Sequence, residues 1–437
     1  MTELSHAGPA VCSPARLEGI VPAPPSKSVA HRAILCAALA ALNKEPSRLA
    51  PIDLSKDISA TLGAVSALGV SSAVNQWVGT IAPEVGFVRQ SRTIDCCESG
   101  STLRFLIPIF AALGVEARFT GQGRLPERPV GVYTDLLPLH GVACRTQGGL
   151  PLSISGKLEA GDYRLPGNIS SQFITGLLLA LPLLDGESRI HLSTPLESAA
   201  YVGMTIEVMK DFGVTVEPTE DGWRIPAGQH YHGCVYTVEG DWSQAAFFLA
   251  AGALGSKIGV SGLNPVSRQG DRAIEALLAQ FGARLRWEDG ALFYLSGELN
   301  GLTIDAAQIP DLVPILSVLG AYCQGRTHLE NAARVRLKEC DRLAAMAEGL
   351  QRLGCPVTQT PDSLAIGAPG RNTLAGGSVN GYNDHRIVMS FAIAALNAAG
   401  PISISDPASI QKSYPGFFRD YTSLGGNAHV SNVVLGN

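Results

Sequence analysis

Residues 23–32 read Ala-Pro-Pro-Ser-Lys-Ser-Val-Ala-His-Arg and lead directly into the apolar segment Ala33-Ile34-Leu35-Cys36-Ala37-Ala38-Leu39-Ala40. The prolines stiffen the chain, and Ser26 or Ser28 can cap the helix that the Ala- and Leu-rich segment favours. Lys27 and Arg32 then lie in the opening turns, where the helix dipole disfavours cations. For this segment alone, two solvated cations are one explanation. An anion bound at the helix start, where backbone amides are free, is the other.

The same pattern, a turn-rich start followed by an apolar helical run, occurs six times. The starts lie roughly 70 residues apart, which is typical of a repeat architecture. The runs span 24–42, 97–114, 166–184, 239–255, 310–325 and 380–400. Short β-rich runs such as 117–120, 189–192 and 257–261 lie between the helices. The repeat predicts an α/β protein of six units, each with two helices and several short strands.

A second, amphipathic segment follows each apolar run and closes on a glycine, which is typical of a helix C-cap. These glycines are Gly69, Gly141, Gly213, Gly282, Gly354 and Gly425. We expect apolar residues at helical spacing to pack these second helices against the core. The residues are Val65, Leu68, Leu136, Leu139, Met209, Phe212, Leu278, Phe281, Leu350 and Leu353.

At 437 residues the chain is too long for one core of ordinary size. Three repeats in each half predict two domains, one from 24 to 238 and one formed by 1–20 together with 241–437. The first 20 residues would then add a strand to the second domain. The chain would cross between domains near 21–24 and again near 238–241, which would make a two-strand hinge.

The composition excludes several classes of protein. The net charge of −5 gives no general support for nucleic-acid binding. The nine cysteines include no Cys-x-x-Cys pair, which favours reduced thiols in a cytoplasmic protein over disulfides or a metal site. The sequence contains no run of about 18 apolar residues, so we expect neither export nor membrane insertion. The sequence contains no phosphate loop ending in Gly-Lys-Ser/Thr, and no dinucleotide fingerprint follows a strand, which agrees with a repeat of α/β units rather than a Rossmann sheet.

Charged and hydroxyl residues collect at the repeat starts. They are Lys27, Ser28, Arg32, Gly100, Arg104, Arg124, Arg128, Ser170, Ser171, Gln172, Asp241, Asp311, Asp384, His385 and Arg386, with a mixed run at 334–342 and Lys412 beyond. Taken alone, the mixed run would be a salt-bridged surface helix start, and Asp241 an N-cap. Together they indicate one polyanionic substrate or two anionic substrates, with carboxylates available for proton transfer.

In these residues the chain resembles the enolpyruvyl transferase family, and within it the branch that acts on shikimate 3-phosphate. The matching motifs are Pro25-Ser26-Lys27-Ser28 with Arg32, the Gly100 turn, Glu127-Arg128-Pro129, Ser170-Ser171-Gln172, Glu239-Gly240-Asp241, Ile309-Pro310-Asp311, Lys338-Glu339-Cys340-Asp341-Arg342, Asn383-Asp384-His385-Arg386 and Lys412. The resemblance implies a two-domain inside-out α/β barrel with three βαβαββ units in each domain. It also implies a cytoplasmic monomer with no cofactor or metal.

The activity implied by the resemblance is transfer of the enolpyruvyl group of phosphoenolpyruvate to the 5-hydroxyl of shikimate 3-phosphate. The products are 5-enolpyruvylshikimate 3-phosphate, on the route to chorismate and the aromatic amino acids, and phosphate. The implied shikimate 3-phosphate ligands are Lys27, Ser28, Arg32, Ser170, Ser171, Gln172, Ser198, Asp311 and Lys338. The implied phosphoenolpyruvate ligands are Lys27, Gly100, Arg128, Gln172, Arg342, Arg386 and Lys412. Lys27, Asp311 and Glu339 would be catalytic.

Chemical reasoning fits these assignments. If burial favours its protonated form, Glu339 could protonate the methylene of phosphoenolpyruvate, while Asp311 accepts the hydroxyl proton. A tetrahedral adduct results, and cations on the leaving phosphate assist its breakdown. Domain closure would assemble these cations and exclude water. The resemblance also implies inhibition by glyphosate at the phosphoenolpyruvate site, where a methyl group on Gly100 would intrude.

The chain departs from the usual family pattern at several positions. Pro25 replaces a glycine, His31 an asparagine, Glu98-Ser99 an Asn-Ala pair and Phe105 a proline. Arg334 stands where an asparagine often touches the sugar phosphate, and its role stays open. None of these changes removes a charge that the mechanism needs.

Two alternative functions are compatible with part of this pattern. A sister enzyme transfers enolpyruvate to UDP-N-acetylglucosamine, but its family carries a cysteine in the loop that here reads Arg124-Leu125-Pro126-Glu127-Arg128. A non-catalytic relative would only bind anions. Simple binding has no use for paired proton carriers, so Asp311 and Glu339 argue against that alternative.

Overall fold

In the computed structural model, which describes residues 8–84, 92–370 and 373–430, the strands form six four-stranded sheets of one topology. In each sheet the two strands at one edge are parallel, and the remaining pairings are antiparallel. Contacts divide the chain into two compact units. We call Pro25–Glu239 the inserted unit, and the residues up to Pro24 and from Gly240 onward the terminal unit.

The inserted unit contains three sheets. In spatial order they are β14 (Val235–Thr237), β3 (Ser47–Ala50), β5 (Val78–Pro83) and β4 (Val70–Asn75); β6 (Arg92–Asp95), β7 (Ala117–Thr120), β9 (Leu152–Gly156) and β8 (Val142–Arg145); and β10 (Asp162–Leu165), β11 (Ser188–Leu192), β13 (Gly222–Ile225) and β12 (Glu217–Pro218). Its helices are α1 (Lys27–Leu42), α2 (Lys56–Val65), α3 (Gly100–Ala112), α4 (Gly131–Leu136), α5 (Ser171–Ala180) and α6 (Ala199–Asp211). Short 3₁₀ helices are η1 (Ser66–Leu68), η2 (Leu125–Glu127), η3 (Leu137–His140) and η4 (Leu181–Leu183).

The terminal unit repeats this plan. Its sheets are β2 (Glu18–Pro22), β15 (Lys257–Ser261), β17 (Ala291–Leu295) and β16 (Arg284–Glu288); β18 (Thr303–Asp305), β19 (Thr327–Glu330), β21 (Leu364–Ile366) and β20 (Val357–Gln359); and β22 (Gly377–Val379), β23 (Ile402–Ile404), β1 (Ala10–Ser13) and β24 (Asn427–Val430). The helices are α7 (Trp242–Ala253), α8 (Ile274–Phe281), α9 (Val313–Tyr322), α10 (Arg342–Arg352), α11 (His385–Ala395) and α12 (Phe417–Ser423). The 3₁₀ helices are η5 (Gly270–Ala273), η6 (Pro310–Leu312), η7 (Ala333–Leu337) and η8 (Pro407–Lys412).

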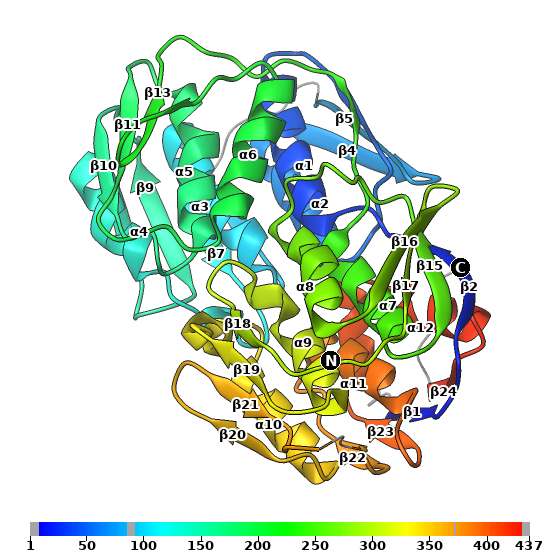
Figure 1. The fold of residues 1–437 in the computed structure, drawn as a ribbon. Helices are drawn as coiled ribbons and strands as arrows, with labels where there is room; N and C mark the ends of the chain where they lie inside the picture. Colours follow the sequence, from blue (N-terminus) through cyan, green and yellow to red (C-terminus); the bar gives the residue numbers. More distant parts are fainter. Residues whose placement is uncertain (1–7, 85–91, 371–372, 431–437) are drawn as a thin grey trace. The chain divides into compact units, whose positions relative to one another are not determined.

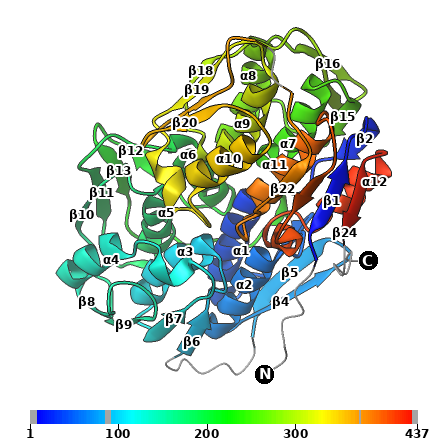
Figure 2. The ribbon, with the colours of Figure 1, turned by 90° about the horizontal axis from the view of Figure 1, so that it is seen from below.

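The core of each unit is built on the apolar helices that begin its repeats (Figures 1 and 2). In the inserted unit α1, α3 and α5 are buried on nearly every face, and in the terminal unit α7, α9 and α11 are buried in the same way. Strands such as β3 and β7 alternate buried and exposed residues, so one face of each sheet packs inward. Helices inside and half-exposed sheets outside make each unit the expected inside-out α/β barrel.

The six glycines expected to end the second helices all have positive φ, between 83° and 109°. This left-handed conformation is strained for residues with a Cβ and is the usual end of a helix, so the C-cap prediction is confirmed.

The expectation that Leu139 packs in the core is wrong, because its side chain is 77% exposed. The second helix of that repeat is α-helical only to Leu136 and continues as η3, which contains Pro138. Leu137, which is fully buried, takes the core position at this end of the segment, and Leu139, two residues later, lies on the solvent side.

Three of the six sheets take one strand from outside their own repeat. Strand β14, at the end of the inserted unit, pairs with β3 near its beginning. At the N-terminus, β1 joins β23 and β24, and β2 joins β15. The N-terminal segment therefore contributes two strands to the terminal unit rather than one. Across the described ranges, no helix is long and apolar enough to cross a membrane.

Candidate active site

The starts of the central helices carry the polar residues that the sequence singled out. Ser26, Ser99 and Ser170 cap α1, α3 and α5, each accepting a backbone N–H with its hydroxyl oxygen. Asp241 and Asp384 cap α7 and α11 in the same way. The fifth repeat differs: Asp311 lies inside η6 and makes no cap, so its carboxylate is available to side chains.

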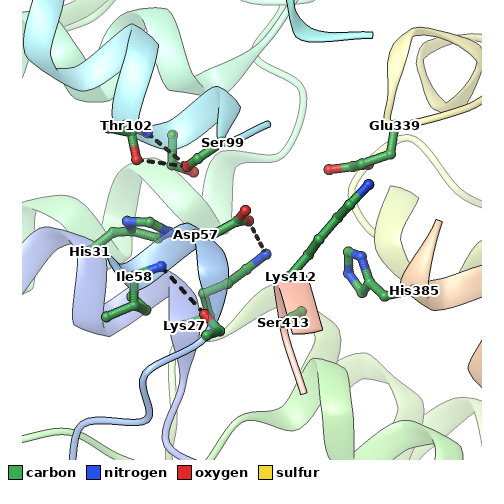
Figure 3. A network of polar contacts seen from close by, with 12 residues as sticks. Lys27, His31, Asp57, Ile58, Ser99, Thr102, Glu339, His385, Lys412 and Ser413 are labelled. Atoms are coloured by element: carbon green, nitrogen blue, oxygen red, sulfur yellow. Dashed lines mark hydrogen bonds and ion pairs between the residues drawn. The ribbon is translucent and has the colours of Figure 1, made fainter. Parts of the chain in front are cut away.

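Lys27 begins α1, and its ammonium group lies 2.7 Å from the carboxylate of Asp57 on α2 (Figure 3). Both side chains are mostly buried, at 17% and 12% exposure. Sequence analysis missed Asp57. The signal was available, because acids also lie at the starts of the second helices of other repeats, as Asp271 and Asp341.

Arg32 is buried and bound by neutral groups from three elements. Its Nε donates to Thr205 Oγ1 on α6 at 2.7 Å. Its Nη atoms donate to the carbonyls of Ser28 and Tyr201 at 2.6 and 3.0 Å, and to Thr175 Oγ1 on α5 at 3.4 Å. Burial lowers its pKa to about 10. Within the described part of the chain no carboxylate forms an ion pair with it. A buried cation without a counter-charge favours an anionic ligand.

Gly100 lies against two guanidinium groups. A Cβ built on it would stand 2.8 Å from Arg128 Nη1 and 2.9 Å from Arg104 Nη1, so only a glycine allows both to approach the start of α3. Arg104 in turn donates to Gln172 Oε1 at 2.8 Å, and the Gln172 amide donates to Ser101 at 3.0 Å. The side chain of Gln172 is thereby fixed between α3 and α5.

The hydroxyl residues proposed for the sugar phosphate lie at helix starts in the same unit. Ser170 caps α5, Ser171 is its first residue, and Ser198 immediately precedes α6 with a φ of 56°. Ser171 and Ser198 are 7% and 3% exposed. Contacts through Arg32 and Gln172 therefore bring the starts of α1, α3, α5 and α6 together.

In the terminal unit, one buried guanidinium holds three carboxylates. Arg342 is 1% exposed and donates to Asp311, Glu339 and Asp384, each at 2.8 Å. These carboxylates raise the pKa of Arg342, and burial opposes them. Lys338 Nζ lies 3.4 Å from Asp311, so this carboxylate is shared between Lys338 and Arg342, with Arg386 as a third cation. Both expected proton carriers, Asp311 and Glu339, are thus held on one rigid group and remain 16% and 18% exposed.

Arg386 and Lys412 complete the cationic set of the terminal unit. Arg386 lies 3.3 Å from Asp311 and donates to Ser243 at 2.7 Å. Ser243 donates to the fully buried Asp271. Burial and the nearby Asp311 raise the pKa of Asp271 to about 6, although Arg386 opposes the shift. Lys412 is 3% exposed and donates to the carbonyl of Asn383 at 2.6 Å, one residue before the α11 cap.

The geometry of the two helix-start clusters agrees with a comparison of the whole sequence with known families. Residues 11–421 match the sequence model of EPSP synthase (3-phosphoshikimate 1-carboxyvinyltransferase). The chain belongs to the EPSP synthase family.

Relatives support this family membership along nearly the full length. The 3-phosphoshikimate 1-carboxyvinyltransferase of Clostridium kluyveri is 43% identical over 416 residues, covering 95% of this chain and 96% of the relative. That of Clostridium acetobutylicum is 43% identical over 423 residues, covering 95% and 97%. The solved EPSP synthase from Acinetobacter baumannii is 27% identical with a TM-score of 0.79, covering 98% and 100%. The enolpyruvyl transferase NikO from Streptomyces tendae, 17% identical with a TM-score of 0.78 over 98% and 99%, shows the fold alone.

Within each unit, the expected site residues are therefore grouped by direct contacts. Lys27, Gly100 and Gln172 lie at the starts of α1, α3 and α5, and the guanidinium of Arg128 lies beside Gly100. In the terminal unit, one ion-paired cluster contains Asp311, Glu339, Arg342 and Arg386. Their roles toward substrates stay predictions. Among the described residues, no three His, Cys, Asp or Glu side chains are placed to hold a metal ion.

Proposed function

We propose that this protein transfers the enolpyruvyl group of phosphoenolpyruvate to the 5-hydroxyl of shikimate 3-phosphate, releasing phosphate. The observation that carries the proposal is the Arg342 cluster, which presents Asp311 and Glu339 at 2.8 Å from one buried guanidinium. A reaction that must both donate and accept a proton needs two carboxyl groups in fixed places. Membership of the EPSP synthase family supplies the substrate class.

Glu339 and Asp311 take the two proton-transfer roles. Glu339 donates a proton to the methylene carbon of phosphoenolpyruvate, which leaves C2 electron-poor. The 5-hydroxyl oxygen bonds to C2 while its proton passes to Asp311, and a tetrahedral adduct forms. In the second half the bond from C2 to the phosphate oxygen breaks, a methyl proton returns to Glu339, and the hydroxyl proton held by Asp311 passes to the released phosphate. The enol ether and phosphate are the products.

Cations and hydroxyls of both units would bind the substrates. Ser28, Arg32, Ser170, Ser171, Gln172, Ser198 and Lys338 would hold shikimate 3-phosphate, with Arg32 toward its carboxylate. Gly100, Arg128, Gln172, Arg342, Arg386 and Lys412 would hold phosphoenolpyruvate, and Lys27 would lie between the substrates. Cations in a dry site stabilise the leaving phosphate more strongly than cations in water, because screening is weaker there.

We further propose a hinge at the two places where the chain crosses between the units. Since the inserted unit is joined to the rest of the chain only near Pro24 and near Gly240, these crossings would act as a hinge, and closure would exclude water from the reaction.

We also propose that the protein is a monomer and works in the cytoplasm. The latter is supported by its nine cysteines, all of which are free thiols.

The test is phosphate release by purified protein given phosphoenolpyruvate, with no metal added. Shikimate 3-phosphate and UDP-N-acetylglucosamine are offered in separate reactions, and a third reaction contains neither. We expect release only with shikimate 3-phosphate. Release only with UDP-N-acetylglucosamine would show that the protein catalyses the reaction of the sister enzyme instead. Release with neither would favour an anion-binding protein without catalysis.

A further inference from the structure

A chain of hydrogen bonds runs through the buried interior of the inserted unit, behind the candidate site. His31 Nδ1 lies 2.8 Å from Thr61 Oγ1, which lies 2.7 Å from Thr102 Oγ1. Thr102 Oγ1 donates to Ser99 Oγ at 2.7 Å (Figure 3). The four side chains are at most 1% exposed and come from α1, α2 and the start of α3. We call them the His31 chain.

The donors and acceptors of the His31 chain can be assigned in only one order. Because Thr102 uses its only hydroxyl hydrogen on Ser99, it must accept from Thr61. Thr61 then has no hydrogen left for His31 and must accept one from Nδ1. His31 is therefore the first donor, in the Nδ1–H tautomer. In that tautomer Nε2 carries no hydrogen, and it has no hydrogen-bond partner within the described ranges.

The surroundings keep the ring of His31 uncharged. Burial lowers the pKa of His31 well below its ordinary value, and the cations Lys27 and Arg32 on the same helix lower it further. Asp57 faces the ring from α2, but it is paired with Lys27. A protonated ring would put a hydrogen on the buried, unpartnered Nε2, which is costly.

The His31 chain ends one residue before Gly100, and its member Thr61 lies 3.4 Å from the backbone carbonyl of Asp57, the ion-pair partner of Lys27. Ser99 caps α3 by accepting the backbone N–H of Thr102 at 3.1 Å, and the next residue is Gly100. Thr61 lies one turn after Asp57, whose carboxylate binds Lys27. Two family departures, His31 and Ser99, are thus joined through Thr61 and Thr102. A third, Phe105, lies under the Arg32 guanidinium, 5.2 Å from it.

We propose that His31 is a positioning residue for phosphoenolpyruvate binding, acting through Thr61, Thr102 and Ser99 to fix the start of α3 at Gly100 relative to Lys27. This inference rests on the proposed function, because it takes Gly100 and Lys27 as ligands of that substrate. It requires a specific hydrogen-bond direction and a specific substrate dependence, and both can be measured.

The kinetic test uses Thr61→Val and Thr102→Val, which keep the side-chain shape and remove one hydroxyl each. The matched control is Thr120→Val on β7, whose hydroxyl makes one long bond of 3.4 Å outside the His31 chain. We expect each chain variant to raise the KM for phosphoenolpyruvate about tenfold and the KM for shikimate 3-phosphate less than twofold, with the control unchanged. The double variant should be no worse than the poorer single variant, because the chain acts as a unit. Equal changes in both KM values, or additive losses, would overturn the proposal.

A spectroscopic test observes the wild-type protein and does not depend on its activity. In protein labelled with ¹⁵N-histidine, His31→Asn identifies the His31 signals by their loss. We expect shifts of the Nδ1–H tautomer in the wild type, unchanged between about pH 8 and pH 6, across the ordinary histidine pKa. The Nε2–H tautomer would overturn the inference even in an active enzyme. A wild-type protein inactive with shikimate 3-phosphate but carrying the Nδ1–H tautomer would instead refute the proposed function.

Discussion

The two units use one repeat plan but compensate their buried arginines in opposite ways. Arg32, at the start of α1, is bound by hydroxyls and carbonyls, whereas Arg342, at the start of α10, is bound by three carboxylates. Both are almost fully buried, at 3% and 1% exposure. The same fold therefore prepares one cation to receive an anion and uses the other to hold acids. Lys27 with Asp57 is the exception in the inserted unit.

The difference shows that the repeat sets where the cations lie but not how their charge is balanced. Helix starts supply backbone amides in both units, which favours anions at each. In the terminal unit, carboxylates are paired with the cations, and these carboxylates can accept or donate protons. Variants that remove one cation or one acid should therefore behave differently in the two units.

The largest expected effect is on stability and comes from Arg342→Met. It leaves the fully buried Asp384 without its guanidinium, and breaking a buried ion pair in this way costs about 3–5 kcal/mol. Arg32→Met removes a cation that has only neutral partners, so we expect a loss of less than about 2 kcal/mol. Urea unfolding followed by tryptophan fluorescence measures both. Equal losses would show that the two arginines are compensated alike.

The second-largest expected effect is on turnover. Asp311→Ala should lower kcat at least a hundredfold with KM values nearly unchanged, because the proposed role of Asp311 is to accept a proton during the reaction. The matched control is Asp305→Ala on β18, an exposed acid in the same repeat. Steady-state kinetics with both substrates provide the measurement, and an unchanged kcat would remove the assignment of Asp311 as the base.

The acid-rich character of the terminal unit also predicts a pH dependence. The pKa of Asp271 is about 6 when folded and near 3.8 when unfolded, so its stabilising contribution is complete below about pH 4 and is lost as the pH rises through 6. Asp271→Asn removes this dependence. Relative to wild type, it should gain about 2–3 kcal/mol of stability between pH 4 and pH 7. A constant difference between these pH values would show that Asp271 does not titrate in this range.

The smallest effect concerns the phosphoenolpyruvate ligands of the inserted unit. In Gly100→Ala the new methyl group meets Arg128 and Arg104 at under 3 Å, so their guanidinium groups must shift. We expect the KM for phosphoenolpyruvate to rise about tenfold, inhibition by glyphosate to weaken, and the KM for shikimate 3-phosphate to stay constant. Gly131→Ala is the control, because a Cβ there meets nothing within 4 Å. Equal inhibition constants for Gly100→Ala and wild type would contradict this assignment.

Local chemistry explains why much of the architecture could be predicted. A glycine that ends a helix and a serine that begins one act through their nearest neighbours, so Gly69 and Ser26 are recognisable without a structure. Periodicity likewise marks buried helices. Periodicity alone could not place Leu139, because Leu137 takes the core position where α4 gives way to η3.

The sequence by itself determined the six-fold repeat, the helix starts and the residue types available for chemistry at each start. These follow from interactions within a few residues and from the alternation of polar and apolar side chains. Tertiary structure alone decided which polar side chains meet, that is, Lys27 with Asp57, Arg342 with Asp311, and His31 with Thr61. These partners are about 30 residues apart in the sequence, and their energies depend on burial, which only the packed chain sets.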